Sequence, residues 1–194
     1  MSDQALSTAT YGPLLKRSLA RASLTSLGVV GVIFALAAGP MLVRDPQGFA
    51  QALSRRGTLH APDLAPVLAA PAAVQVHLAT ILAALVVTGV LMSGVKGSRL
   101  HRVLGWGWSA AMILTALSAF FIKAGVGPTV LGFGVLHIFA VMTLISVPRA
   151  VLAARRHDVA SHARVISAFV VGGLGVAGLA AFLPGRLVWS VFFG

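Results

Sequence analysis

Long apolar segments, separated by short basic breaks, constrain the fold of this chain more than any other feature. A helix needs about 20 apolar residues to cross the roughly 30 Å hydrocarbon core of a bilayer. Only 10% of the residues are charged, against roughly 25% in soluble domains, so lipid must cover much of the surface. The pattern predicts one all-α domain over residues 1–194, an integral membrane helical bundle of about five transmembrane helices. The five segments are residues 26–43, 72–95, 103–122, 128–152 and 165–183.

The distribution of Lys and Arg predicts how this bundle is oriented. With five spans, ten of these 15 residues lie on the side of the N-terminus and five on the other side. Because Lys and Arg concentrate in cytoplasmic loops, we expect residues 1–24 to be cytoplasmic and residues 44–70 to form an extracytoplasmic loop. The C-terminus then lies outside a bacterial inner (plasma) membrane. The long stretch before the first span favours an uncleaved anchor over a secretory signal. Basic residues in such breaks fit membrane lipid as a partner, and not nucleic acid.

Several classes of chemistry are excluded by the residues that are missing. The chain has no cysteine, so it can form neither disulfides nor thiolate metal sites. The four Asp residues lie outside the predicted spans, whereas ion-coupled transporters usually keep a charged group at membrane depth. There is no phosphate-binding glycine loop, nucleophile elbow or carboxylate pair. The reactive side chains that remain are six histidines.

Four of the histidines form two pairs by depth. His77 and His137 lie about 8 Å and about 13 Å below the outer boundary of their spans, at about 1.5 Å per residue, and a shift of a few residues in either boundary removes the difference. His101 and His162 stand at the inner edges of two other spans. Histidines from facing helices at one depth suit bis-imidazole ligation of haem iron. The pattern predicts one or two haem b groups, with these four side chains as metal ligands.

Other side chains are candidates for contact with the same cofactor. Arg99, Arg102 and Arg164 lie near the inner pair, where guanidinium groups suit haem propionates. The alternative is that these arginines only determine the membrane topology and contact lipid headgroups. The alternative for the inner histidines is that they cap their helices. The alternative for the outer histidines is that they form hydrogen bonds to neighbouring helices without iron. We interpret Trp106 and Trp108 as residues of the interfacial aromatic belt.

The histidines stand in motifs that resemble a known family. The motifs are the single residues His77 and His137 and the stretches 100–106 (LHRVLGW), 161–164 (SHAR) and 183–186 (LPGR). Together they resemble the bacterial predicted-membrane-protein family called domain of unknown function 2306, over roughly residues 20 to 187. The resemblance implies a protein with several membrane spans and says little about activity.

A more distant resemblance is to the transmembrane di-haem b cytochromes of the ascorbate-reducing type. In those proteins a four-helix core carries one histidine per helix; the first and third helices bind one haem, and the second and fourth bind the other. His77 with His137 and His101 with His162 follow that order, although His101 and His162 stand at the edges of their spans. The resemblance implies a four-helix core that carries the histidines, with the first helix at its periphery.

Three functional hypotheses follow. The first is a b-type cytochrome that moves electrons in the membrane, at most the haem b component of an electron-transfer oxidoreductase, with a quinol or a redox protein as its partner. The second is a haem-free structural or accessory subunit of a larger inner-membrane complex. The third is a membrane protein that binds lipid or a small molecule without redox function. An absorption spectrum separates the first hypothesis from the other two.

Overall fold

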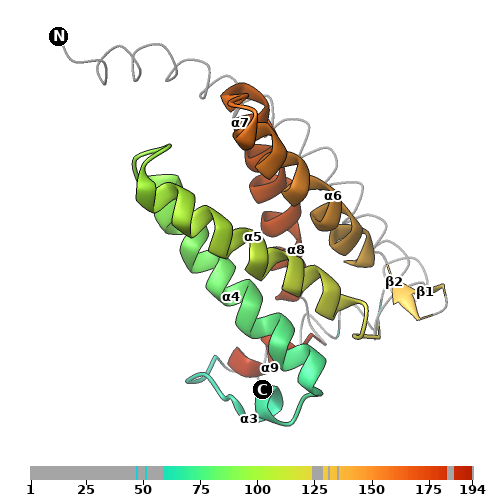
Figure 1. Ribbon diagram of the computed structural model, residues 1–194. Helices are drawn as coiled ribbons and strands as arrows, with labels where there is room; N and C mark the ends of the chain where they lie inside the picture. Colours follow the sequence, from blue (N-terminus) through green and yellow to red (C-terminus); the bar gives the residue numbers. More distant parts are fainter. Residues whose placement is uncertain are drawn as a thin grey trace.

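The protein is mostly helical in the computed structural model, which describes residues 47, 51, 59–123, 129–130, 132–134, 136–182 and 186–193 (Figure 1). The long helices are α4 (Ala72–Ser93), α5 (Arg99–Ala119) and α6 (Leu136–Arg155). A last long helix consists of α7 (Val159–Ala168), the π-helical η1 (Phe169–Gly175) and α8 (Val176–Ala181). The short elements are α3 (Ala65–Leu68), β1 (Thr129–Val130), β2 (Phe133–Gly134) and α9 (Leu187–Phe192).

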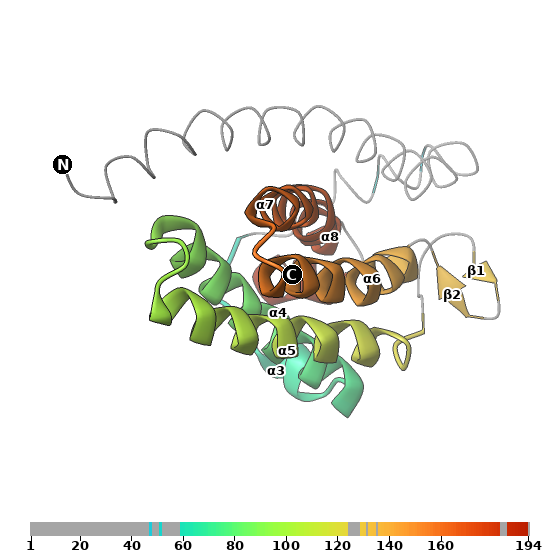
Figure 2. The ribbon, with the colours of Figure 1, turned by 45° about the horizontal axis from the view of Figure 1, so that its top comes forward.

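The long helices form two antiparallel hairpins. The first is α4 with α5, and the second is α6 with the helix that begins as α7 (Figure 1). Helix α5 packs against α4 and α6, and α6 packs against α7 and η1, so α6 lies between α5 and α7 (Figure 2). Both hairpin turns lie at one end of the bundle. We call it the basic end because it carries Lys96, Arg99, Arg102, Arg149, Arg155, Arg156 and Arg164. The strands β1 and β2 and the short helices α3 and α9 lie toward the other end.

Short polar side chains fix where the two helices leaving the basic end begin. The Ser98 side chain accepts a hydrogen bond from the backbone N–H of His101 (3.1 Å), and Asp158 accepts one from the backbone N–H of Ser161 (3.0 Å). Such N-caps satisfy backbone donors that have no partner within the helix. Gly97, with φ of +74°, makes the tight turn before Ser98 that a side chain would disfavour. These caps place His101 and His162 in the first turns of α5 and α7.

An apolar core joins the two hairpins. It consists of buried side chains from all four long helices: Ala84, Trp108, Met112, Val147, Phe169 and Leu174. The outer face of α4 carries large apolar side chains that are exposed, among them Leu82, Val86 and Val90. Exposing this much apolar surface to water costs roughly 25 cal/mol per Å². A lipid environment removes that cost, as expected for a membrane protein.

The helical membrane architecture predicted from the sequence is confirmed, but the count of five spans is not. The described residues contain three helices that are long and apolar enough to cross a membrane: α4, His137–Arg155 and Val159–Ala181. Helix α5 covers most of the predicted third span, but Arg102 and its Gly, Trp and Ser residues lower its mean hydropathy. The predicted first segment, residues 26–43, lies outside the described residues.

Candidate functional site

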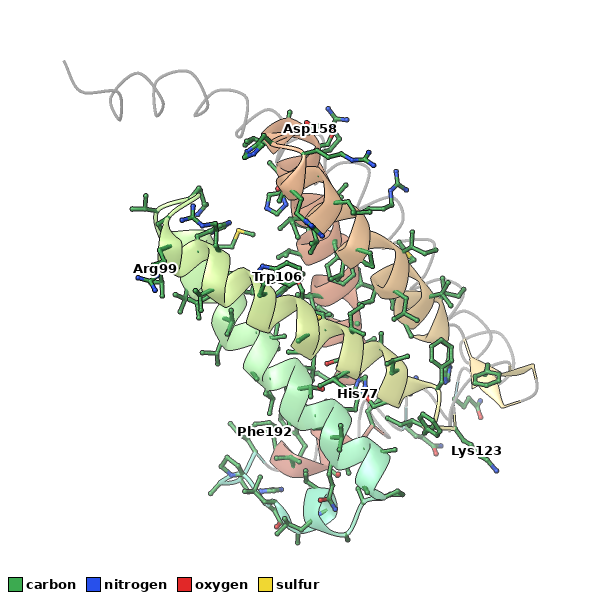
Figure 3. The ribbon with its side chains drawn as sticks, viewed as in Figure 1. His77, Arg99, Trp106, Lys123, Asp158 and Phe192 are labelled. Carbon is green, nitrogen blue, oxygen red and sulfur yellow. The ribbon has the colours of Figure 1, made fainter. Side chains whose placement is uncertain are left out.

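The four histidines predicted to be ligands lie in two places. His101 and His162 stand at the basic end, in the first turns of α5 and α7. His77 lies on α4 beside the second half of α5 (Figure 3), and His137 lies near the start of α6. His101 and His162 therefore have different surroundings from His77 and His137, and the two sets differ in how their ring nitrogens are used.

At the basic end the two imidazole rings lie next to each other. Their centres are 6.4 Å apart and their planes are inclined by 78°. Two imidazoles that ligate one metal ion from opposite sides place their ring centres roughly 6 Å apart, because each metal–nitrogen bond is about 2 Å long and each nitrogen lies about 1 Å from its ring centre. The observed spacing therefore suits a single metal ion held between the rings.

The ring nitrogens of this pair are also in a suitable state for a ligand. Nδ1 of His162 lies 2.9 Å from the carbonyl oxygen of Ala150, which can only accept, so this nitrogen donates its hydrogen. In the neutral ring, the lone pair is then on Nε2, the arrangement usual for a metal-binding histidine. Nδ1 of His101 is buried and has no hydrogen-bond partner in the described part of the chain. An orphaned buried nitrogen of this kind fits a group that the protein binds.

Burial of the His101 ring, together with the charges near it, favours its neutral form. His101 precedes the predicted third span, and burial lowers the pKa of its imidazole; the nearby His162 and Lys96 lower that pKa further. A neutral imidazole keeps the lone pair that metal binding requires.

The three predicted arginines all lie at the basic end but have different surroundings. Nη1 of Arg102 donates to the carbonyl oxygen of Gly97 at 2.8 Å. Arg164 is exposed on α7. The pKa of the nearby Asp158 carboxyl is lowered mainly by hydrogen bonds from Ser161 and further by Arg164. Arg99 is exposed at the end of the α4–α5 hairpin (Figure 3). A role for them in binding propionates stays a prediction.

The His77 ring, on α4, forms hydrogen bonds with groups of α5. Its Nδ1 lies 3.0 Å from the carbonyl oxygen of Thr115 and 3.2 Å from the hydroxyl of Ser118. The hydroxyl of Thr115 in turn donates to that of Thr80 on α4 (2.7 Å). These polar contacts join the two helices of the first hairpin within its apolar interface.

His137 is bonded to α5 from the other side. Its Nε2 lies 3.1 Å from the carbonyl oxygen of Ala119 and 3.0 Å from that of Ile122. Its Nδ1 accepts from the backbone N–H of Gly134 at 3.1 Å. Both ring nitrogens are thus used by backbone groups. The structure ties His77 and His137 each to the C-terminal part of α5 rather than to each other.

Trp108 is the residue that sequence reasoning placed wrongly. It is buried at 4% exposure, and its Nε1 donates to the hydroxyl of Thr88 at 2.8 Å, whereas Trp106 is 61% exposed. The interfacial interpretation therefore fails for Trp108. Its ring meets that of Phe169, with centres 6.0 Å apart and planes at 85°. A spacing of seven residues from His101 to Trp108, and again from His162 to Phe169, was the signal that could have revealed this contact.

The described residues contain no group of three or more His, Cys, Asp or Glu side chains that could hold a metal ion. The histidine pair at the basic end is therefore the arrangement to consider. Known proteins add little to this picture: no curated protein and no solved structure matches the chain. The model of the family described as predicted membrane protein (DUF2306) matches residues 68–191, a range that includes both hairpins. The chain belongs to this DUF2306 family of predicted membrane proteins.

Proposed function

We propose that this protein is an electron carrier of the membrane, a b-type cytochrome in which His101 and His162 hold one haem between α5 and α7. The observation that carries the proposal is the pair of imidazoles with centres 6.4 Å apart, one of which has an orphaned buried nitrogen. When bound between them, haem supplies one-electron chemistry through its Fe³⁺ and Fe²⁺ states. The protein's own contribution is to hold the two rings.

The surroundings of each ring support this role. The carbonyl of Ala150 orients His162 and fixes its tautomer, as a partner of a ligating histidine does. The N-cap at Ser98 fixes the first turn of α5, which carries His101. By contrast, both nitrogens of His137 are bonded to the backbone. For that reason we propose one haem rather than two.

The proposed topology has five spans, with α5 among them and the N-terminus in the cytoplasm of a bacterial inner membrane. Charge supports this orientation, because cytoplasmic ends of membrane proteins are rich in Lys and Arg. Among the described residues, the end of the bundle with Lys123 and Arg186 carries fewer Lys and Arg residues than the basic end. A quinol or a redox protein would then exchange electrons with the haem near the cytoplasmic face. The basic end carries Lys96, Arg99, Arg102, Arg149, Arg155, Arg156 and Arg164.

An absorption spectrum tests the proposal. The protein, purified from cells supplied with a haem precursor, should be red and show a dithionite-reduced b-type spectrum with about one haem per chain. The variants His101→Ala and His162→Ala should lose that spectrum. Added imidazole should restore it in His101→Gly, because the free ligand can occupy the space left by the side chain.

Two histidines outside the pair provide matched controls. His60→Ala and His157→Asn should keep the full haem content; Asn is chosen because the backbone of His157 has a φ of 58°, which Asn tolerates. A colourless wild-type protein would contradict the proposal. So would a spectrum that survives unchanged in both His101→Ala and His162→Ala.

A second candidate, a haem-free structural or accessory subunit of a larger inner-membrane complex, is favoured by the apolar outer face of α4. Large side chains there, including Leu82, Leu85 and Val86, are exposed in the described structure, and another membrane helix could cover them. This function predicts a stable partner that co-purifies with the protein. Replacing Leu85 and Val86 by Trp should disrupt such a complex, and the purified wild-type protein should be colourless.

A further inference from the structure

A second aromatic contact lies beneath the histidine pair. Helices α5 and α7 both begin at the basic end and run in the same direction (Figure 1). Trp108 follows His101 by seven residues, and Phe169 follows His162 by seven. Seven residues are two helical turns, so the rings of Trp108 and Phe169 meet roughly 10 Å further into the bundle on the same faces. The two helices therefore approach through aromatic rings at two levels.

Neighbouring residues hold both rings of the deeper level. The hydroxyl of Thr88 accepts from Nε1 of Trp108 and donates to the carbonyl oxygen of Ala84 at 2.7 Å, which fixes the indole from the side of α4. The Phe169 ring lies against the backbone of Gly173, where a Cβ atom would be 3.1 Å from the ring. Both rings are buried, at 4% and 6% exposure.

The side of α5 between the two levels is open. Gly105 stands four residues after His101 and three before Trp108, on the same face of the helix. A Cβ atom added at Gly105 would meet no atom within 4 Å. A bare metal ion between the histidines needs no such space, whereas the edge of a flat macrocycle does.

We infer that Trp108 and Phe169, held by Thr88 and Gly173, form the wall that closes the histidine site toward the middle of the membrane and set the redox potential of the haem there. This inference rests on the proposed function. An apolar wall excludes water from one side of the site, and the surroundings of an iron site control its potential through solvent access and dielectric. Excluding water disfavours the more highly charged Fe³⁺ form, so the intact wall keeps the midpoint potential high.

The test is a redox titration of the purified haem protein, followed by its absorption spectrum. Phe169→Leu and Trp108→Leu should retain the haem and shift the midpoint potential to lower values, because the smaller side chains let water approach. Gly173→Ala should give a smaller shift in the same direction, since the added methyl group displaces the Phe169 ring. Gly173→Ala and Phe169→Leu still decide the question if Trp108→Leu does not fold.

Matched controls exist on the same helices. Trp106→Leu changes an exposed tryptophan two residues away, and Gly178→Ala adds a methyl group where it meets no atom within 4 Å. Neither control should alter the midpoint potential. A red wild type whose potential is the same in all three wall variants would overturn this inference alone. A colourless wild type would overturn it together with the proposed function.

Discussion

At the scale of single residues, the histidines differ in what their ring nitrogens contact. His101 and His162 lie next to each other, while Nε2 of His137 meets carbonyl groups near the end of α5 and its Nδ1 accepts from the backbone N–H of Gly134. A helix C-terminus leaves carbonyl groups without partners within the helix, and within a membrane such groups must find partners in the protein. His137 therefore acts as a side-chain cap for α5, a role that needs the N–H donor of its ring at this position.

This role predicts a difference in stability. His137→Ala removes the side-chain donor that the carbonyls of Ala119 and Ile122 share, and among the described residues Ala119 then keeps only the backbone N–H of Ile122. We therefore expect the free energy of unfolding to fall by about 1–3 kcal/mol. Any haem held at the basic end should remain. Unfolding in detergent mixtures measures the first quantity and absorption measures the second. His60→Ala, at the same end of the molecule as His137, is the control and should change neither the stability nor the haem content. Loss of haem with unchanged stability would contradict this assignment.

Sequence reasoning reached the residue types of the site but not their partners. Depth along each span predicted two pairs of histidines, because depth follows directly from position in a helix. It could not tell which nitrogen meets which carbonyl, since that depends on helix rotation and on how α5 ends. The error at Trp108 has the same origin: periodicity alone does not say whether a tryptophan faces lipid or another helix.

At the scale of elements, the helix ends follow local chemistry. Pro71 precedes α4, while Ser98 and Asp158 cap α5 and α7. Helix boundaries near these residues were predictable, because proline and capping side chains act locally. The π-helical η1 was not predicted. Its wider turns accompany the packing of Phe169 against Gly173 and Trp108, contacts between residues that no local pattern connects.

The cap of α7 should make stability depend on pH. Hydrogen bonds from the side chain and the backbone N–H of Ser161 hold the pKa of the Asp158 carboxyl below its usual value, and Arg164 lowers it further. The folded state therefore binds fewer protons than the unfolded state. Its stabilisation is fully present above the unfolded value of about 3.9 and is lost as the pH falls through the lower folded value.

Asp158→Asn isolates this effect, because Asn caps helices without titrating. The melting temperature of the wild type in detergent should fall more steeply than that of Asp158→Asn as the pH is lowered from 6 toward 2.5. Parallel curves for the two proteins would show that the carboxyl does not contribute in this way.

At the scale of the whole molecule, the open question in the architecture is α5. It pairs with α4 along its length (Figure 1), although its composition is less apolar than that of the three helices suited to crossing. Its polar side chains are turned inward, where Ser109, Thr115 and Ser118 are buried. A helix whose polar groups face its neighbours can cross a membrane at lower mean hydropathy, because lipid meets only its apolar side.

The absence of cysteine from the chain allows this crossing to be tested with single introduced thiols. Ala61, before α4, and Ala160, at the start of α7, are both exposed and are separated by α4, α5 and α6. Three crossings place them on opposite sides of the membrane, whereas two crossings place them on the same side. In right-side-out vesicles a membrane-impermeant maleimide should label Ala61→Cys directly and Ala160→Cys only after permeabilisation. Equal labelling of both would mean that α5 does not cross, and the reverse pattern would mean that the basic end faces outward.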